Sequence, residues 1–300
     1  PGARGPRPRL SVDVVRDVVW PLARDAERCL FVVVDCLRLD QWRALRPRVE
    51  ADFEVEESLY CSILPTATPY ARNAIFSGLF PDEFVRRRPE RWRAADEASR
   101  NAFEDRWFEE QIRTLGGGRV PARYERIFSP ADGDALLRKL PGLLDAPGVL
   151  ALVVNFVDLL THGRAESPLL LEIARDAEAL RRLTAAWYEG SALREVLREC
   201  ARRDVPVVWT TDHGSVHCRR PATVYAKRDA TANLRYKIGD DLRAEDPRTA
   251  WCVADGQEIR CPGGGWKTNY LLALEDHFFV YRRSSGSTRP ATATTSSTAA

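Results

Sequence analysis

The chain has 300 residues, which is enough for one large domain or two small ones. Hydrophobic residues make up 44% of it, and this excludes a wholly disordered chain. Lysine and arginine total 45 against 43 aspartates and glutamates, so the net charge of +2 gives no general electrostatic argument for a nucleic-acid or membrane partner.

The cysteines are odd in number, scattered along the chain, and form no CxxC pair. This pattern argues against a disulfide framework or a four-cysteine zinc site and favours reduced thiols. No apolar run reaches the length of about 18 residues that a membrane helix needs, and no signal peptide is recognisable. We therefore expect a cytoplasmic protein with no membrane partner.

In chain order, the first expected elements are a loose segment, a helix and a buried strand. Residues 1–10 are rich in proline, glycine and arginine, and residues 11–28 carry apolar side chains at helical spacing. The run from Cys29 to Val34 is continuously apolar, which is typical of a strand buried in a parallel sheet. Two later runs share this character and a third is a candidate strand: Gly148–Val157, Asp204–Thr211 and Phe278–Tyr281.

The rest of the chain is expected to be helical or disordered. Residues 83–130 are dense in arginine, glutamate and aromatic residues, lack strand character, and are expected to form a helical cap insertion. Two helices are expected at Leu169–Trp187 and Ser191–Arg203, and a disordered tail over residues 282–300. Strands that alternate with helices predict an α/β fold, with a mostly parallel central sheet flanked by helices, in one domain over residues 11–281.

Three of the expected strands end at an aspartate: Asp35, Asp158 and Asp212. In open α/β sheets, ligands lie beyond the carboxyl ends of the strands. Three carboxylates gathered there would repel one another unless a cation held them. The alternative for each aspartate taken singly is that it caps the helix that follows.

Two histidines lie close to these aspartates in sequence. His162 is four residues after Asp158 and shares a face with it if the segment is helical, and His213 directly follows Asp212. Carboxylate and imidazole together suit zinc, or manganese less well. The expected metal ligands are Asp35, Asp158, His162, Asp212 and His213.

A hydroxyl nucleophile is a further candidate. Thr66 and Thr68 precede an expected helix that begins near Pro69. Thr68 either caps this helix or, beside a metal ion at the helix N-terminus, acts as a nucleophile.

Several motifs, taken in order, resemble the PglZ domain of the alkaline phosphatase superfamily, in particular the effector domain of PorX-type response regulators. The resemblance covers about residues 10–281. The motifs are Asp35-Cys-Leu-Arg-Leu-Asp40-Gln-Trp, Leu64-Pro-Thr-Ala-Thr-Pro-Tyr-Ala-Arg-Asn-Ala-Ile-Phe-Ser-Gly-Leu, Asn155-Phe-Val-Asp-Leu-Leu-Thr-His and Thr210-Thr-Asp-His-Gly, with Asn233-Leu-Arg-Tyr-Lys237 and Lys267-Thr-Asn269 as further matches.

This resemblance implies an alkaline-phosphatase-like fold and two zinc ions. Asp35, Thr68, Asp212 and His213 then match one metal site, with Thr68 as the nucleophile and Thr66 as its rival. Asp158 and His162 match two ligands of the other site. The candidate substrate contacts are Thr66, Arg72, Asn73 and Lys267.

The chain departs from the family pattern at one ligand. To the site matched by Asp158 and His162, the family supplies a third ligand, a histidine in a Gln-His-Gly-Gly-like motif near the end of the domain. This chain has no such motif. His217 and His277 are the only spare imidazoles. We therefore expect an incomplete site, and a chain cut short at its C-terminal end.

Three functions stay open at this point. The first is a metal-dependent phosphoesterase, in particular a phosphodiesterase acting on a nucleotide or oligonucleotide. The second is a catalytically silent signalling module, and the third a phosphomutase of the same superfamily. The resemblance also implies a two-component response regulator with a receiver domain upstream, and a homodimer is a candidate assembly.

Overall fold

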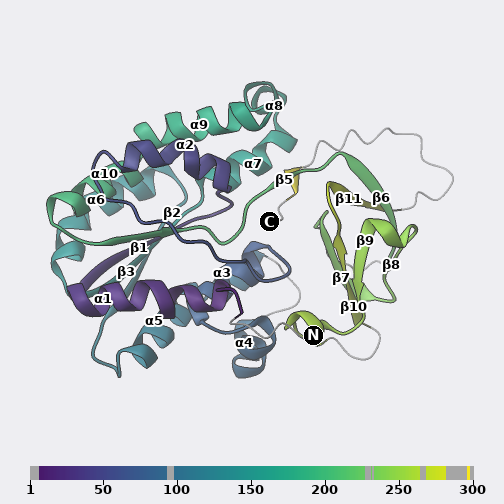
Figure 1. Ribbon diagram of the computed structural model, residues 1–300, viewed down its shortest axis with the longest axis horizontal. Helices are drawn as coiled ribbons and strands as arrows, with labels where there is room; N and C mark the ends of the chain where they lie inside the picture. The colour runs from purple at the N-terminus through teal and green to yellow at the C-terminus, as the bar shows by residue number, and fades with distance from the viewer. Residues whose placement is uncertain are drawn as a thin grey trace.

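The computed structural model of the chain describes residues 7–92, 98–226, 231, 233–263, 268–281 and 296–297. A larger α/β unit holds the central sheet, and a unit of short strands, later in the chain, lies beside it (Figure 1).

Four parallel strands in the order β2-β3-β1-β4 form the central sheet: β1 (Arg28–Val34), β2 (Ala122–Ile127), β3 (Gly148–Val154) and β4 (Val207–Thr210). Strand β1 pairs in register with β3 along its whole length and with β4 on its other side. All of β3 and nearly all of β1 are buried, because helices cover both faces of the sheet. The expected α/β fold with a parallel central sheet is confirmed.

Successive residues of β1 enter two separate cores. Leu30, Val32 and Val34 lie in one core, and Phe31 and Val33 lie in the other, because side chains alternate across a strand. Figure 1 shows the two helical layers that close these cores. The first layer contains α2 (Leu39–Val49), α6 (Pro130–Asp145), α9 (Ala177–Glu189) and α10 (Ala192–Arg202). The second contains the π-helical η2 (Val15–Val19), α1 (Trp20–Ala26), α3 (Thr68–Ser77), α4 (Pro81–Arg87) and α5 (Glu104–Leu115).

Some strands and helices begin or end at other residues than the sequence predicts. The strand expected over Gly148–Val157 ends at Val154, and helix α7 (Phe156–Glu166) begins two residues later. The helix expected at Leu169–Trp187 is two helices, α8 (Pro168–Ile173) and α9. The remaining short helical turns of this unit are η1 (Ser11–Asp13), η3 (Pro89–Arg91) and η4 (Ala98–Asn101).

Residues 83–130 differ from the expected helical cap. They contain α5, but the expectation that this region lacks strands is wrong, since β2 belongs to the central sheet. This strand lies at the sheet edge and none of its residues is fully buried. Its apolar positions alternate with Arg123 and Glu125, so no continuous apolar run marks it.

The second unit consists of two small sheets. The candidate strand at Phe278–Tyr281 does form, as β11, but it pairs with β6 outside the central sheet. Helix α3 joins the units, because its Tyr70 packs edge-on against Tyr236 with ring centroids 5.9 Å apart. The strands are β6 (Arg220–Tyr225), β7 (Tyr236–Asp240), β8 (Arg243–Ala244), β9 (Ala250–Val253), β10 (Thr268–Ala273) and β11 (His277–Tyr281), with the turns η5 (Pro247–Thr249) and η6 (Gly256–Ile259).

The chain ends fall largely outside the described residues. This holds for residues 1–6 of the expected loose segment and for the expected disordered tail at 282–300, apart from β12 (Ser296–Ser297), which pairs with β5 (Val216–His217). Across the described part of the chain, every helix is too short or too polar to cross a bilayer.

Candidate active site

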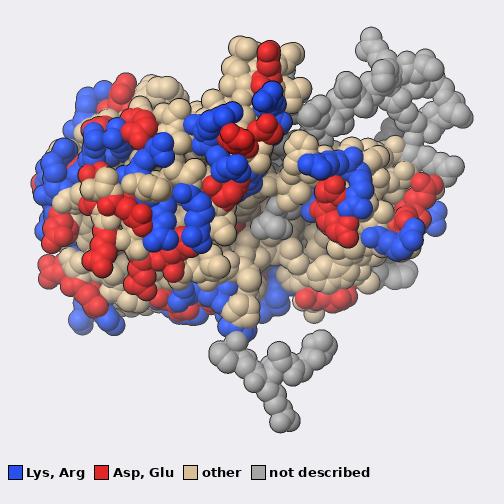
Figure 2. Space-filling model, turned by 45° about the horizontal axis from the view of Figure 1, so that its top comes forward, with Lys and Arg blue, Asp and Glu red and all other residues tan. Residues whose placement is uncertain are grey.

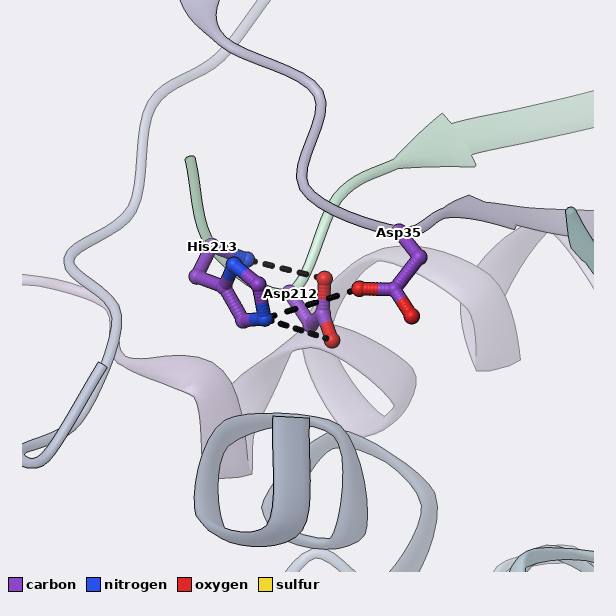
Figure 3. Close-up of side chains that lie close together, drawn as sticks. All are labelled: Asp35, Asp212 and His213. Carbon is purple, nitrogen blue, oxygen red and sulfur yellow. Dashed lines mark hydrogen bonds and ion pairs between the residues drawn. The ribbon is translucent and has the colours of Figure 1, made fainter. Parts of the chain in front are cut away.

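The candidate site lies at the carboxyl edge of the central sheet. Asp35 directly follows β1, and Asp212 and His213 follow β4, the neighbouring strand. Parallel strands end at the same edge, so these three side chains meet although they are far apart in sequence. Their potential ligand atoms all lie within 4.8 Å of one another (Figure 3).

The three residues are buried, backbone and side chain taken together. Their exposed fractions are 2% for Asp35, 0% for Asp212 and 3% for His213. His213 Nε2 lies 3.5 Å from Asp35 Oδ1 and 3.6 Å from Asp212 Oδ2. Ligand atoms around a tetrahedral zinc ion are about 3.3 Å apart, since each bond is about 2.0 Å long. The spacing therefore fits one divalent cation between these atoms.

The two oxygens of Asp212 have different surroundings. Oδ1 accepts backbone hydrogen bonds from His213, at 3.0 Å, and from Cys36, at 3.3 Å. Cys36 has a φ of +63°, a rare conformation that turns the chain after β1 toward Asp212. Oδ2 is buried and has no hydrogen-bond partner among the described residues. A buried acceptor left unpaired is costly, and a cation would pair it.

His213 is oriented by its other ring nitrogen. Nδ1 lies 3.2 Å from the Gly214 carbonyl oxygen, which has no proton to give, so Nδ1 is the donor. In the neutral ring the lone pair is then on Nε2, the nitrogen that faces the two carboxylates. This is the arrangement that fixes a histidine for metal binding.

Thr68 brings its hydroxyl to the same point. Thr68 is the first residue of α3 and Ala67 is its N-cap, so the alternative in which Thr68 caps the helix is wrong. Its Oγ1 lies 2.8 Å from His213 Nε2 and 3.4 Å from Asp35 Oδ1. The hydroxyl therefore faces the candidate metal ligands at a helix N-terminus, where the helix dipole favours negative charge.

Without a cation, the buried carboxylates of Asp35 and Asp212 repel each other. Burial raises the pKa of Asp35 well above its usual range, the Asp212 carboxylate adds to this rise, and Arg72 opposes it. A bound divalent cation would remove the repulsion between the two carboxylates.

Asp158 and His162 form a separate pair on α7. His162 Nε2 lies 3.2 Å from Asp158 Oδ1, as expected for residues one helical turn apart. The His162 side chain is 57% exposed. Among the described residues, neither belongs to a group of three potential ligand atoms, and neither does His217; His277 belongs to another group with Glu275 and Asp276.

The candidate substrate contacts lie in different surroundings. Thr66 is buried. Asn73 donates from Nδ2 to the carbonyl oxygens of Pro69, at 2.8 Å, and Arg100, at 3.0 Å, so this nitrogen ties α3 to η4. Arg72 donates to Asp35 Oδ2 at 2.5 Å and to Glu104 Oε1 at 2.6 Å. Lys267 lies outside the described residues.

Glu104 is a buried residue of the site region that the sequence did not indicate. Its exposed fraction is 2%, and it accepts hydrogen bonds from Arg72, from Asn101 and from the Tyr124 hydroxyl. It is one of many acidic residues in the region 83–130, and nothing in the sequence separates it from them. A cavity of about 620 Å³ opens beside it, lined by Asn101, Ala102, Glu104, Asp105, Tyr124, Glu125, Arg126, Phe128 and Asp132.

Comparison with known proteins shows the family of this chain. The family model described as the BREX system PglZ alkaline phosphatase-like domain matches residues 14–259, a span that includes Asp35, Thr68, Asp212 and His213. No curated protein matches the chain.

Proposed function

This chain belongs to the PglZ alkaline phosphatase-like family, and from that premise we propose that it is a phosphoesterase whose divalent cation is held by Asp35, Asp212 and His213. The single observation that carries the proposal is the buried Oδ2 of Asp212, which has no hydrogen-bond partner in the described part of the chain and faces His213 Nε2 beside the Thr68 hydroxyl. A carboxylate–carboxylate–imidazole donor set fits zinc.

When bound, the cation would supply charge stabilisation and lower the pKa of a hydroxyl next to it. Thr68 Oγ1 attacks phosphorus and gives its proton to solvent. The Oγ1–P bond forms, the bond from phosphorus to the leaving oxygen breaks, and the departing alkoxide takes up a proton from solvent to leave as the alcohol. Water then cleaves the phosphothreonine and returns the free hydroxyl. His213 Nε2 has one lone pair, so it acts as a ligand and not as the base for Thr68.

The finer proposal for the substrate is a phosphodiester of a nucleotide or oligonucleotide, in line with the family resemblance. Figure 2 shows basic and acidic side chains intermixed over the face that it presents. This face gives no basic surface for a nucleic acid, so recognition of the substrate would depend on local contacts near Thr68. The cavity is connected to Thr68 through Asn101, which lines it and donates to the Thr68 carbonyl oxygen at 3.2 Å, but neither Thr68 nor the three proposed ligands line it.

A specific observation favours the second candidate, a catalytically silent signalling module. Asp158 and His162 are paired with each other and, among the described residues, are joined by no third ligand within 4.8 Å. If catalysis needs a second cation at this pair, the chain would bind one cation without turnover.

The test combines metal content with turnover. Elemental analysis of the purified chain, with bis-p-nitrophenyl phosphate as substrate, should show at least about one cation per chain and hydrolysis. Thr68→Val should keep the cation and lose hydrolysis, because only the hydroxyl is removed. Thr114→Val, on the exposed side of α5, is the matched control and should keep both.

Each contrary result has a distinct meaning. A wild-type chain that binds no cation would refute the metal-dependent proposal. A cation without hydrolysis of this ester would favour the silent module. Full hydrolysis by Thr68→Val would refute Thr68 as the nucleophile and leave Thr66 as the candidate nucleophile.

A further inference from the structure

Arg72 and Glu104 form a buried ion pair that extends directly from the candidate ligand Asp35. Arg72 donates to Asp35 from Nη1 and to Glu104 from Nε, and the exposed fractions of the three side chains are 5%, 3% and 2% respectively. A guanidinium is rigid and planar, so two fixed contacts determine its orientation. The carboxylate oxygen that it holds is therefore fixed as well.

Two side chains of α3 lie beside the two carboxylate oxygens of Asp35. Thr68 and Arg72 are four residues apart on α3, so they project from the same face one turn apart. The Thr68 hydroxyl lies 3.4 Å from Oδ1, and Arg72 holds Oδ2 at 2.5 Å. Oδ1 is thereby left facing His213, at 3.5 Å.

The contacts close into a ring. Glu104 also accepts a hydrogen bond from Asn101, and the same Asn101 nitrogen donates to the carbonyl oxygen of Thr68 at 3.2 Å. The Tyr124 hydroxyl donates to the other oxygen of Glu104 at 2.5 Å. The ring therefore links the backbone of the proposed nucleophile to the carboxylate of a proposed metal ligand.

The charges also balance. Arg72 alone would place a positive charge next to a bound cation, and Glu104 compensates it at 2.6 Å. With His213 neutral, the three carboxylates Asp35, Asp212 and Glu104 and the one guanidinium leave two negative charges, which one divalent cation neutralises.

We propose that Arg72 and Glu104 are positioning residues that hold Asp35 with Oδ1 toward the cation, and that Arg72 is not a phosphate contact. This inference rests on the proposed function, because it concerns the same cation. Removing a side chain that holds a metal ligand in place typically weakens metal binding by about 10- to 100-fold.

The test measures the dissociation constant of Zn²⁺ by competition with a chromogenic chelator, in the absence of substrate. Glu104→Gln preserves size but removes the charge that compensates Arg72, and it should raise this constant by about 10-fold or more. Glu110→Gln is the matched control. Glu110 lies on α5, as Glu104 does, and forms an ion pair with Arg91 of η3 at 2.7 Å; its replacement breaks this pair and should leave the constant unchanged.

A second variant covers the case in which Glu104→Gln does not fold. Arg72→Lys retains the positive charge but loses the two-point contact, and it should also weaken Zn²⁺ binding about 10-fold or more. Excess Zn²⁺ should restore hydrolysis in either variant, which a change confined to folding or to phosphate contact would not produce.

The outcomes separate the two proposals. A wild-type chain that does not bind Zn²⁺ refutes the proposed function and this inference with it. If the wild type binds Zn²⁺ and a folded Glu104→Gln or Arg72→Lys binds it equally well, only the positioning role is overturned.

Discussion

Replacing Asp212 with asparagine should stabilise the metal-free protein, although it removes a proposed ligand. In the wild type, Oδ2 of Asp212 is buried and unpaired among the described residues, which costs about 1–3 kcal/mol. Asparagine retains Oδ1, which accepts the backbone hydrogen bonds, and removes both the unpaired negative charge and its repulsion from Asp35. We expect the free energy of unfolding to rise by about 1–3 kcal/mol.

The order of stability should reverse when the cation is added. At a free cation concentration about 100 times its dissociation constant, the wild type gains about 2.7 kcal/mol. Asp212→Asn lacks the charged ligand and should gain much less. The wild type is then expected to become the more stable protein, by an amount that grows with the cation concentration.

Thermal or urea unfolding in EDTA and in excess Zn²⁺ measures both effects. Asp25→Asn is the matched control, because Asp25 is exposed and pairs only with the exposed Arg24 among the described residues. It should change stability little under either condition. The reasoning would be refuted if Asp212→Asn destabilised the metal-free protein, or if Zn²⁺ stabilised this variant as much as the wild type.

Two further predictions concern pH and the core. Burial raises the pKa of Asp35 above 3.8 in the folded metal-free protein. The contribution of this carboxyl group to the free energy of unfolding is therefore fully present below pH 3.8 and is lost as the pH rises through the raised pKa. Urea midpoints measured in EDTA over a pH series should therefore fall with rising pH more steeply for the wild type than for Asp35→Asn. Equal slopes of midpoint against pH would contradict the raised pKa of Asp35. Leu152→Ala, in the middle of β3 where the side chain is fully buried, should cost about 2–5 kcal/mol in urea unfolding, and a loss below about 1 kcal/mol would mean that the core relaxes around the change.

The sequence indicates three of the four described strands of the central sheet and not β2. The runs that begin at Cys29 and Gly148 are continuously apolar because β1 and β3 are covered on both faces. Strand β2 lies at one edge of the sheet with its side chains partly exposed, and Arg123, Glu125 and Arg126 interrupt its apolar residues. In the second unit, β9 (Ala250–Val253) and most of β10 (Tyr270–Ala273) are also apolar, as is β11, but these runs are short.

The same reasoning explains which site residues could be predicted. Asp35 and Asp212 are recognisable because each follows a buried strand, and His213 and Thr68 stand next to a strand end and a helix start. Glu104 acts through space on Arg72, from a segment where acidic residues are common. Its burial follows from the packing of α5, which no local pattern of charges reveals.

Helix α3 has almost no solvent-facing side, since every residue from Tyr70 to Ser77 is buried. Ile75 and Phe76 belong to the core under the sheet, whereas Tyr70 and Ala74 belong to the core shared with β7, β9 and β10. Freeing this helix would open both cores at once. Its amide protons should therefore exchange with solvent only through global unfolding, and Thr68, two residues before this segment, starts a helix that does not fray by itself.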